Sequence, residues 1–316
     1  SMKRIIKFAV IVFIVIIITD ILVGFGCRFY INNHRLSGEF GEIDYIVNKS
    51  DEDIIILGSS VALNGINPNI ITDSLRASCY NGGANGQILP YYESLLECIV
   101  KRENKPSIII LGLRTNELAG EGNGGRYSVF LPYYHTGMEN IDKRLEAKSR
   151  EEKYFLSSNL YRYNPIWWRL FLYVFLPPEE KGKNGFTGKP LPMVYPELKN
   201  DISSPITNER INSFLNMVQL CKKNDIKLII LFPPMYFHYS DKTETIDYIE
   251  KYCIKNGIPC YNDSQDSTFT SDNHLFYDNI HVNIEGCKKY TLIICKRLKQ
   301  LDKNNFLISS NNTKDI

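Results

Sequence analysis

The chain has 316 residues, 44% of them hydrophobic, and a formal net charge of +2 at pH 7. This length and apolar content suit one domain with a sizeable core and an insertion. The near-neutral charge gives no general attraction for nucleic acid. The sequence also lacks a basic stripe, zinc-ligand spacing of cysteine or histidine, and a glycine-rich phosphate loop with a lysine. We therefore predict no metal, no cofactor and no nucleic-acid partner.

The N-terminus predicts a membrane anchor over residues 1–27. Residues 5–26 are almost wholly apolar and follow the basic pair Lys3 and Arg4. About 20 apolar residues span a bilayer, whereas the apolar part of a cleaved signal peptide, the alternative, is usually about 7–15 residues long. We expect the N-terminus in the cytoplasm and the rest of the chain outside, by the positive-inside rule. Asp20 either contacts another helix or water within the membrane, or lies near the outer interface, which we favour.

Strands alternate with helices after a linker over residues 28–50. Short branched-chain runs predict strands, and longer segments with helical periodicity predict helices. The predicted strands are 53–57, 78–81, 107–111, 227–232 and 259–261; the predicted helices are 68–76, 91–102, 208–223, 243–255 and 283–301. This alternation predicts an α/β fold, a three-layer α/β/α sandwich with about five parallel strands in a nearly flavodoxin-like order. Residues 303–316 form a polar tail.

A candidate nucleophile follows the first predicted strand. Ser60 ends the run Gly58-Ser59-Ser60, while Asp278 and His281 lie three residues apart near the C-terminus. Serine needs an imidazole base within hydrogen-bond reach, and a carboxylate usually fixes the tautomer of that imidazole. Ligands of open α/β sheets bind outside the carboxyl ends of the strands, where we expect Ser60. These residues predict acyl transfer with Ser60 as nucleophile, His281 as general base and Asp278 as its partner.

Four separated blocks of the sequence resemble the SGNH (GDSL-like) family of hydrolases and acyltransferases. The blocks are residues 58–60, 80–87, 112–117 and 278–286. The resemblance implies a catalytic domain of the SGNH fold over residues 51–302. It also implies that Ser60, Asp278 and His281 are catalytic and that Ser60, Gly86 and Asn116 form the oxyanion hole.

Ser59 stands where the family commonly has Asp, and Arg114-Thr115-Asn116-Glu117 departs from the family's Gly-x-Asn-Asp. The serine variant resembles membrane-tethered members that handle cell-envelope polymers, such as alginate acetylation proteins and the D-alanyl transfer protein of teichoic acids. Gly86 suits a close backbone approach and Asn116 offers a neutral amide donor, but a plain turn and a helix cap are the alternative interpretations. Arg114 either binds an anionic substrate group or forms a structural ion pair with Glu117 or another carboxylate.

An insertion at about 120–205 falls outside the four blocks. Its aromatic run, residues 154–175, contains both tryptophans of the protein, Trp167 and Trp168. Three hypotheses stand: a lid packed on the core, a sugar-stacking wall, and a surface on the membrane or on a membrane partner. The candidate substrate-binding residues are Ser59, Arg114, Trp167 and Trp168. Cys253 and Cys260 are the one pair close enough in sequence to suggest a disulfide.

The site chemistry and the resemblance together predict a membrane-anchored, extracytoplasmic serine O-acyltransferase or carbohydrate esterase. Its expected substrates are O-acyl groups, most simply O-acetyl groups, of a cell-envelope polysaccharide or exopolysaccharide. The resemblance implies a membrane-bound O-acyltransferase as partner. The alternatives are a non-catalytic SGNH-like scaffold of a polysaccharide-modification complex, and a lipid esterase with an interfacial lid.

Overall fold

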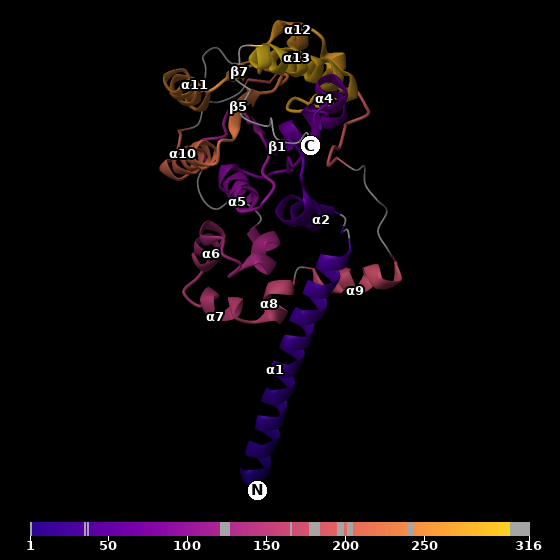
Figure 1. The fold of residues 1–316 in the computed structure, drawn as a ribbon, viewed down its shortest axis with the longest axis vertical. Helices are drawn as coiled ribbons and strands as arrows, with labels where there is room; N and C mark the ends of the chain where they lie inside the picture. Colours follow the sequence, from indigo (N-terminus) through magenta and orange to yellow (C-terminus); the bar gives the residue numbers. More distant parts are fainter. Residues whose placement is uncertain are drawn as a thin grey trace, which may run out of the picture. The chain divides into compact units, whose positions relative to one another are not determined.

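The chain forms two compact units (Figure 1). One comprises Ser1–Tyr45 and Arg126–Lys181, and the other comprises Ile46–Gly125 and Gly182–Ile316. The computed structural model describes residues 2–34, 36, 38–120, 127–164, 166–176, 184–194, 199–200, 205–238 and 243–303. The predicted tail after residue 303 lies outside these ranges. We call the first unit the helical unit and the second the sheet unit.

The sheet unit contains a five-stranded parallel sheet in the order β2-β1-β3-β5-β7. In chain order, the strands are β1 (Ile54–Gly58), β2 (Cys79–Asn81), β3 (Ile108–Gly112), β5 (Lys227–Phe232) and β7 (Cys260–Asn262). Strand β1 lies between β2 and β3, and β5 and β7 follow in order beyond β3. This is the predicted flavodoxin-like order, and the predicted α/β sheet is confirmed.

The central strands are continuous apolar runs because both of their faces are covered. All five residues of β1 and of β3 are buried. Successive side chains of a strand point to opposite faces, so Ile54 and Ile56 share one face with Ile110 of the neighbouring strand. These residues belong to the core cluster that also holds Tyr290 and Ile294 of the last helix. Strands buried on both faces read as unbroken branched-chain segments in the sequence.

Helices cover the two faces of the sheet. One layer contains α5 (Leu89–Val100), α10 (Asn208–Lys223) and α11 (Glu244–Asn256), and the other contains α3 (Ser60–Gly65), α4 (Pro68–Leu75) and α13 (Ile284–Lys303). In the second layer, α13 contacts both α3 and α4. The layers on either side of the sheet are the predicted α/β/α sandwich. Short elements complete this unit: β4 (Lys199–Asn200) paired in parallel with β6 (Phe237–His238), α12 (Ser267–Thr270) and η3 (Asn273–Leu275).

The helical unit is built on α1 (Met2–Asn33), drawn in indigo in Figure 1. Among the described residues, this helix alone is long and apolar enough to cross a membrane, a test that a signal sequence also passes. The other elements are α2 (Gly38–Asp44), η2 (Tyr127–Tyr133), α6 (Glu139–Glu146), α7 (Glu152–Leu156), α8 (Asn159–Tyr163) and α9 (Trp167–Phe175). A π-helical turn, Tyr45–Lys49, joins the two units. Much of the predicted linker over residues 28–50 is therefore helical, and the aromatic run lies in α7, α8 and α9.

All eight cysteines of the chain are free thiols, so the suggested disulfide between Cys253 and Cys260 is not formed. Cys253 is fully buried on the inner face of α11, whereas Cys260 begins the edge strand β7. Sequence proximity therefore gave the wrong pairing. Burial also raises the pKa of Cys98, Cys221 and Cys287 to about 12, which keeps these thiols protonated and unreactive.

Candidate active site

Ser60 lies at the carboxyl end of the central strand β1 and begins α3. The turn between them requires a glycine at position 58. Gly58 has a φ of 145°, and a Cβ atom there would lie 2.1 Å from the carbonyl oxygen of Gly112 on β3. The close pairing of Gly58 with Gly112 thus sets the point at which the chain leaves the sheet. The half-buried Ser60 side chain stands at that point.

Asp278 and His281 belong to one tight turn. An antiparallel bridge between Phe276 and Val282 closes the turn, and the backbone N–H of Tyr277 donates to the carbonyl of His281 at 2.9 Å. Phe276 and Val282 are both buried in the core cluster that covers the sheet. Two apolar residues therefore hold the ends of the turn in the core, while the polar residues between them remain at the surface.

The structure brings the three predicted residues into one hydrogen-bonded series. Nε2 of His281 lies 2.7 Å from Oγ of Ser60. Nδ1 of the same imidazole lies 2.9 Å from both carboxylate oxygens of Asp278. These distances are within the range for a nucleophile, its base and the group that orients the base. We call these three residues the candidate triad.

The carboxylate of Asp278 is held in its ionised form. Burial raises its pKa, but hydrogen bonds from the His281 side chain and from the backbone N–H groups of Ile280 and His281 lower the pKa overall. An ionised carboxylate only accepts hydrogen bonds, so Nδ1 of His281 must carry a proton. The lone pair of neutral His281 is then on Nε2 and faces the hydroxyl of Ser60.

Gly86 and Asn116 follow the two strands beside β1. Gly86 lies in the loop after β2, and Asn116 lies after β3, so the segments carrying Ser60 and both predicted oxyanion donors leave the sheet at the same edge. Gly86 has a φ of 67°, and a Cβ atom there would meet open space. Its backbone N–H donates to no residue in the described ranges. These features leave the Gly86 N–H available to a ligand.

A pocket of about 320 Å³ joins the Asn116 segment to the turn of Asp278 and His281. Its lining residues are Arg114, Thr115, Asn116, Ala119, Gly120, Met235, Phe237 and Ile280. Ile280 lies between Asp278 and His281 in the chain. The turn is also tied to the loop after β5, since Tyr236 and Asn279 exchange backbone and side-chain hydrogen bonds of 2.8 and 3.0 Å. The pocket is therefore a candidate acyl or acceptor site beside the candidate triad.

Asn81 is a positioning residue that the sequence did not reveal. Its buried side chain donates to the carbonyl of Ala62 within α3 at 2.9 Å and to that of Ile66, the residue that follows α3, at 2.7 Å. It also accepts from the backbone N–H of Gly83 at 2.9 Å. Asn81 thus fixes α3 against the loop that carries Gly86. The sequence feature that could have pointed to Asn81 is its position in the block of residues 80–87, in which we assigned a function only to Gly86.

Arg114 forms an ion pair with the fully buried Glu117, as the second of the two hypotheses for this residue predicted. Nε of Arg114 lies 3.4 Å from Oε2 of Glu117, and this charge raises the pKa of the guanidinium. Arg114 still lines the pocket, with 37% of its side chain exposed. Ser59 is 1% exposed and offers no surface through which its side chain would meet a substrate. Trp167 and Trp168 belong to α9 and thus to the helical unit, whereas the candidate triad belongs to the sheet unit.

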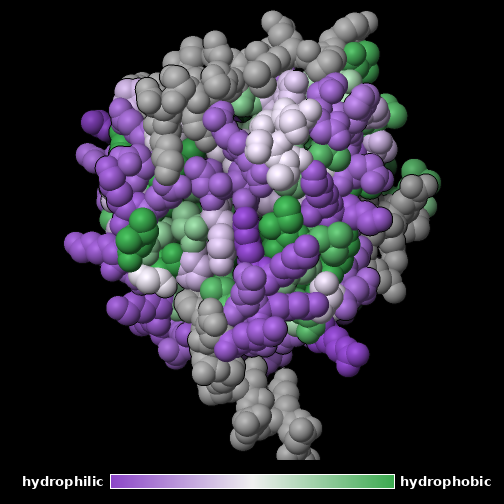
Figure 2. Space-filling model, turned by 90° about the horizontal axis from the view of Figure 1, so that it is seen from above, coloured by the Kyte–Doolittle hydropathy of each residue, from purple (hydrophilic) through white to green (hydrophobic). Residues whose placement is uncertain are grey.

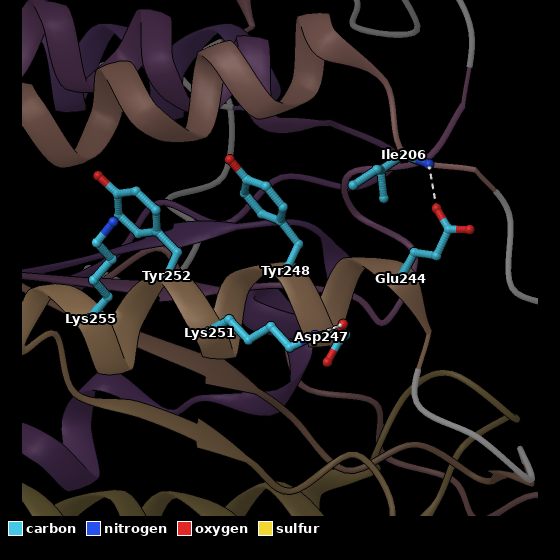
Figure 3. A pocket seen from close by; sticks show the side chains of 7 residues that line it. All are labelled: Ile206, Glu244, Asp247, Tyr248, Lys251, Tyr252 and Lys255. Carbon is cyan, nitrogen blue, oxygen red and sulfur yellow. Dashed lines mark hydrogen bonds and ion pairs between the residues drawn. The ribbon is translucent and has the colours of Figure 1, made fainter.

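Another pocket, of about 420 Å³, lies between α11 and Ile206, which precedes α10 (Figure 3). Tyr248 and Tyr252 point the same way from α11, while Lys251 pairs with Asp247 at 2.6 Å and Glu244 accepts from the Ile206 N–H at 3.3 Å. Its lining contains no residue of the candidate triad and neither Gly86 nor Asn116. The described residues also include no cluster of three or more potential metal ligands.

No family model and no curated protein matches this sequence. Among solved structures, the chain is similar to a protein assigned to the G-D-S-L lipolytic family from Desulfitobacterium hafniense DCB-2, with 13% identity and a TM-score of 0.40 over 77% of this chain and 97% of that chain. It is also similar to a GDSL-like lipase from Bacteroides thetaiotaomicron VPI-5482, with 12% identity and a TM-score of 0.40 over 83% of this chain and 99% of that chain.

Proposed function

We propose that the protein is a serine esterase or O-acyltransferase of the SGNH type that works through an acyl-Ser60 intermediate. The observation that carries this proposal is the hydrogen-bonded series from Ser60 through His281 to Asp278. The resemblance of four sequence blocks to the SGNH family also supports it, and two of these blocks, residues 80–87 and 112–117, lie outside the candidate triad. A serine next to a neutral imidazole that is oriented by a carboxylate is an arrangement for nucleophilic attack on an acyl carbonyl.

The reaction has two halves. His281 Nε2 accepts the proton of Ser60 as Oγ attacks the carbonyl carbon, and the resulting oxyanion receives hydrogen bonds from the N–H groups of Ser60 and Gly86 and from the Asn116 amide. When the tetrahedral intermediate collapses, the protonated His281 gives its proton to the leaving alkoxide, and acyl-Ser60 remains. An acceptor hydroxyl then donates its proton to His281 and attacks the acyl carbon. As this second intermediate collapses, the bond from the acyl carbon to Oγ breaks and His281 gives the proton to Oγ, which restores Ser60 and releases the acylated acceptor.

The acceptor decides whether the enzyme is an esterase or a transferase. Water as acceptor gives hydrolysis, and a sugar hydroxyl gives O-acyl transfer. We favour an envelope polysaccharide or exopolysaccharide as the acceptor, with acetyl as the simplest acyl group. Support comes from the Ser59 variant of the first block, and the partial exposure of Ser60 and His281 leaves both side chains accessible to an acceptor. A membrane-bound O-acyltransferase that delivers the acyl group is part of this proposal, by resemblance alone.

The location belongs to the same proposal. We infer that α1 stays uncleaved and anchors the protein in the cell membrane, with Lys3 and Arg4 on the cytoplasmic side and the sheet unit outside. The length and composition of α1 support this anchor. An extracytoplasmic sheet unit would have access to envelope polymers.

Hydrolysis of p-nitrophenyl esters of increasing chain length by the detergent-solubilised full chain tests the proposal. Ser60→Ala and His281→Ala should each remove most activity, and His274→Ala is a matched control because its exposed side chain lies outside the candidate triad. Acetyl esters should be preferred, whereas preference for long-chain esters would favour a lipid esterase. Addition of an oligosaccharide should yield an acylated sugar in a Ser60-dependent way. Polymer acylation in cells that persists with Ser60→Ala would favour the non-catalytic scaffold.

A further inference from the structure

Helix α9 exposes an apolar face that points away from the unit to which it belongs. Ile166 and Leu170 are buried, with 4% and 5% of their surface exposed. The opposite side of the helix carries Trp168, Phe171, Leu172 and Phe175, which are 40–67% exposed. Positions i, i+3, i+4 and i+7 form one stripe on a helix. We call these four residues the outer face of α9.

This face differs from the exposed apolar residues of the sheet unit. In the sheet unit, the large exposed apolar side chains are scattered over several elements: Leu191, Val194, Ile254, Tyr277, Ile284 and Leu292. The face drawn in Figure 2 likewise shows hydrophobic residues in separate groups among hydrophilic ones. A contiguous apolar stripe on a helix that is also apolar on its inner side is typical of a surface covered by lipid or protein.

Asp20 of α1 fixes the segment that leads into α9. Its carboxylate accepts from the hydroxyl of Ser158 at 2.6 Å and from the backbone N–H groups of Asn159 at 3.0 Å and Leu160 at 2.8 Å. It therefore satisfies the open N–H groups at the start of α8. Helices α8 and α9 both contact α1 (Figure 1).

Gly24 and Arg28 extend this contact along the same face of α1, because they follow Asp20 at intervals of four residues. A Cβ atom at position 24 would lie 2.4 Å from the side chain of Asn159, so only glycine lets α8 approach this closely. The guanidinium of Arg28 donates to Oδ1 of Asn159 at 3.4 Å. Three successive turns of α1 thus hold α8, and with it the start of α9, at one height along the helix.

That height corresponds to a membrane interface. The apolar part of α1 begins at Ile5, after Lys3 and Arg4, and 20 residues at 1.5 Å each, about 30 Å, reach Gly24 in the middle of the contact with α8. This length matches the roughly 30 Å of a bilayer core. We propose that the outer face of α9 lies in the lipid at the interface where α1 leaves the bilayer, as a second membrane contact. This inference rests on the anchor role of α1 and is independent of the acyl-transfer chemistry.

The composition of α9 fits this position. Trp has an apolar ring with one polar N–H and is enriched where one side is apolar and the other wet. Arg169 is exposed at the edge of the stripe, and its guanidinium lies 5.6 Å from the centre of the Trp168 ring. A guanidinium there meets the phosphates of lipid headgroups while the aromatic rings enter the acyl region.

Tryptophan fluorescence tests the contact selectively, because both tryptophans of the protein lie in α9. The full chain is reconstituted in phosphatidylcholine–phosphatidylglycerol vesicles whose acyl chains are brominated near the headgroup or near the bilayer centre. Shallow bromines should remove most of the emission and deep bromines less, while aqueous acrylamide quenches weakly. Strong acrylamide quenching without bromine quenching would overturn the inference. A second result would also overturn it: weak acrylamide quenching that depends on the protein-to-lipid ratio, together with no quenching by bromine. A second copy of the chain, and not lipid, would then cover the outer face of α9.

Paired variants and an alkaline wash distinguish the membrane contact of α9 from the anchoring by α1. Phe171→Ser with Phe175→Ser should weaken shallow bromine quenching, whereas Ile254→Ser with Leu292→Ser, exposed apolar residues of the sheet unit, should leave it unchanged. Equal effects of the two pairs would contradict the role of α9. A chain that stays in vesicles at alkaline pH but escapes bromine quenching contradicts the α9 contact alone. A chain that washes off contradicts the anchor as well, and neither result bears on ester hydrolysis.

Discussion

Nε2 of His281 lies 2.7 Å from Oγ of Ser60, although 221 positions separate the two residues in the chain. The sheet explains this proximity. Ser60 leaves its central strand, and the turn of His281 is held over the same unit by the buried Phe276 and Val282. The short distance between Ser60 and His281 depends on packing of the core. Variants that loosen the packing of Phe276 or Val282 should therefore lower activity before they unfold the chain.

Asp278 should contribute to stability at neutral pH and lose that contribution in acid. Its pKa in the folded protein lies below the ordinary value of 3.8, so its ionised form favours folding above that value. The contribution falls as the pH drops from about 4 through the lowered pKa. The difference in urea midpoint between the parent protein and Asp278→Asn should therefore be constant above about pH 5 and shrink below it. A difference that stays the same down to pH 2 would show that Asp278 is not held ionised by the fold.

Asn81→Ala should lower kcat more than it raises KM, because Asn81 holds α3 and thereby positions Ser60. The loss of its buried hydrogen bonds should also cost about 1–3 kcal/mol of unfolding free energy. Asn67→Ala is the matched control. It removes the N-cap of α4, at about 1 kcal/mol, without touching α3 through its side chain. Kinetics at a temperature where both variants are folded should show a kcat loss only for Asn81→Ala, and equal kcat values would contradict the positioning role.

Asn116→Ala should reduce kcat by about 10²–10³ with little change in KM if its amide stabilises the oxyanion. Arg114→Ala, at the same pocket, should instead act through substrate binding and through the loss of its pair with the buried Glu117. Steady-state kinetics with p-nitrophenyl acetate distinguish the two effects. A tenfold or smaller loss of kcat for Asn116→Ala would assign this residue to the pocket wall.

Asp20→Ala should release the start of α8 from α1. The N–H of Leu160 donates to Asp20, so hydrogen exchange over residues 158–163 should become faster in the variant, measured on the full chain in detergent or nanodiscs. Thr19→Val is the neighbouring control, because the Thr19 hydroxyl donates only within its own helix, to Val15. Unchanged exchange in Asp20→Ala would show that other contacts hold α8.

The sequence predicted the sheet and the candidate triad because both have local signals. Buried parallel strands are unbroken apolar runs, and Ser60, Asp278 and His281 stand in short motifs at a strand end and in one turn. The end of β1 was misjudged by one residue, since Gly58 still pairs with Gly112 on β3. That pairing depends on a residue 54 positions away, which no local pattern reports.

The insertion and its contacts could not be predicted in the same way. Asp20 had two interpretations, and its partners Ser158 and Asn159 are 138 and 139 positions away. The supporting role of Asn81 was hidden because its acceptors are backbone carbonyls, which have no sequence signature. The suggested disulfide failed for a related reason, since closeness in sequence says nothing about which face of a helix a cysteine occupies.

Mass spectrometry of the full chain after brief reaction with an activated acetyl ester tests the acyl-Ser60 intermediate most directly. We predict one acetyl adduct that maps to Ser60, is absent from Ser60→Ala, and forms much more slowly in His281→Ala. An adduct at another residue, or hydrolysis that continues at the parent rate in Ser60→Ala, would contradict it.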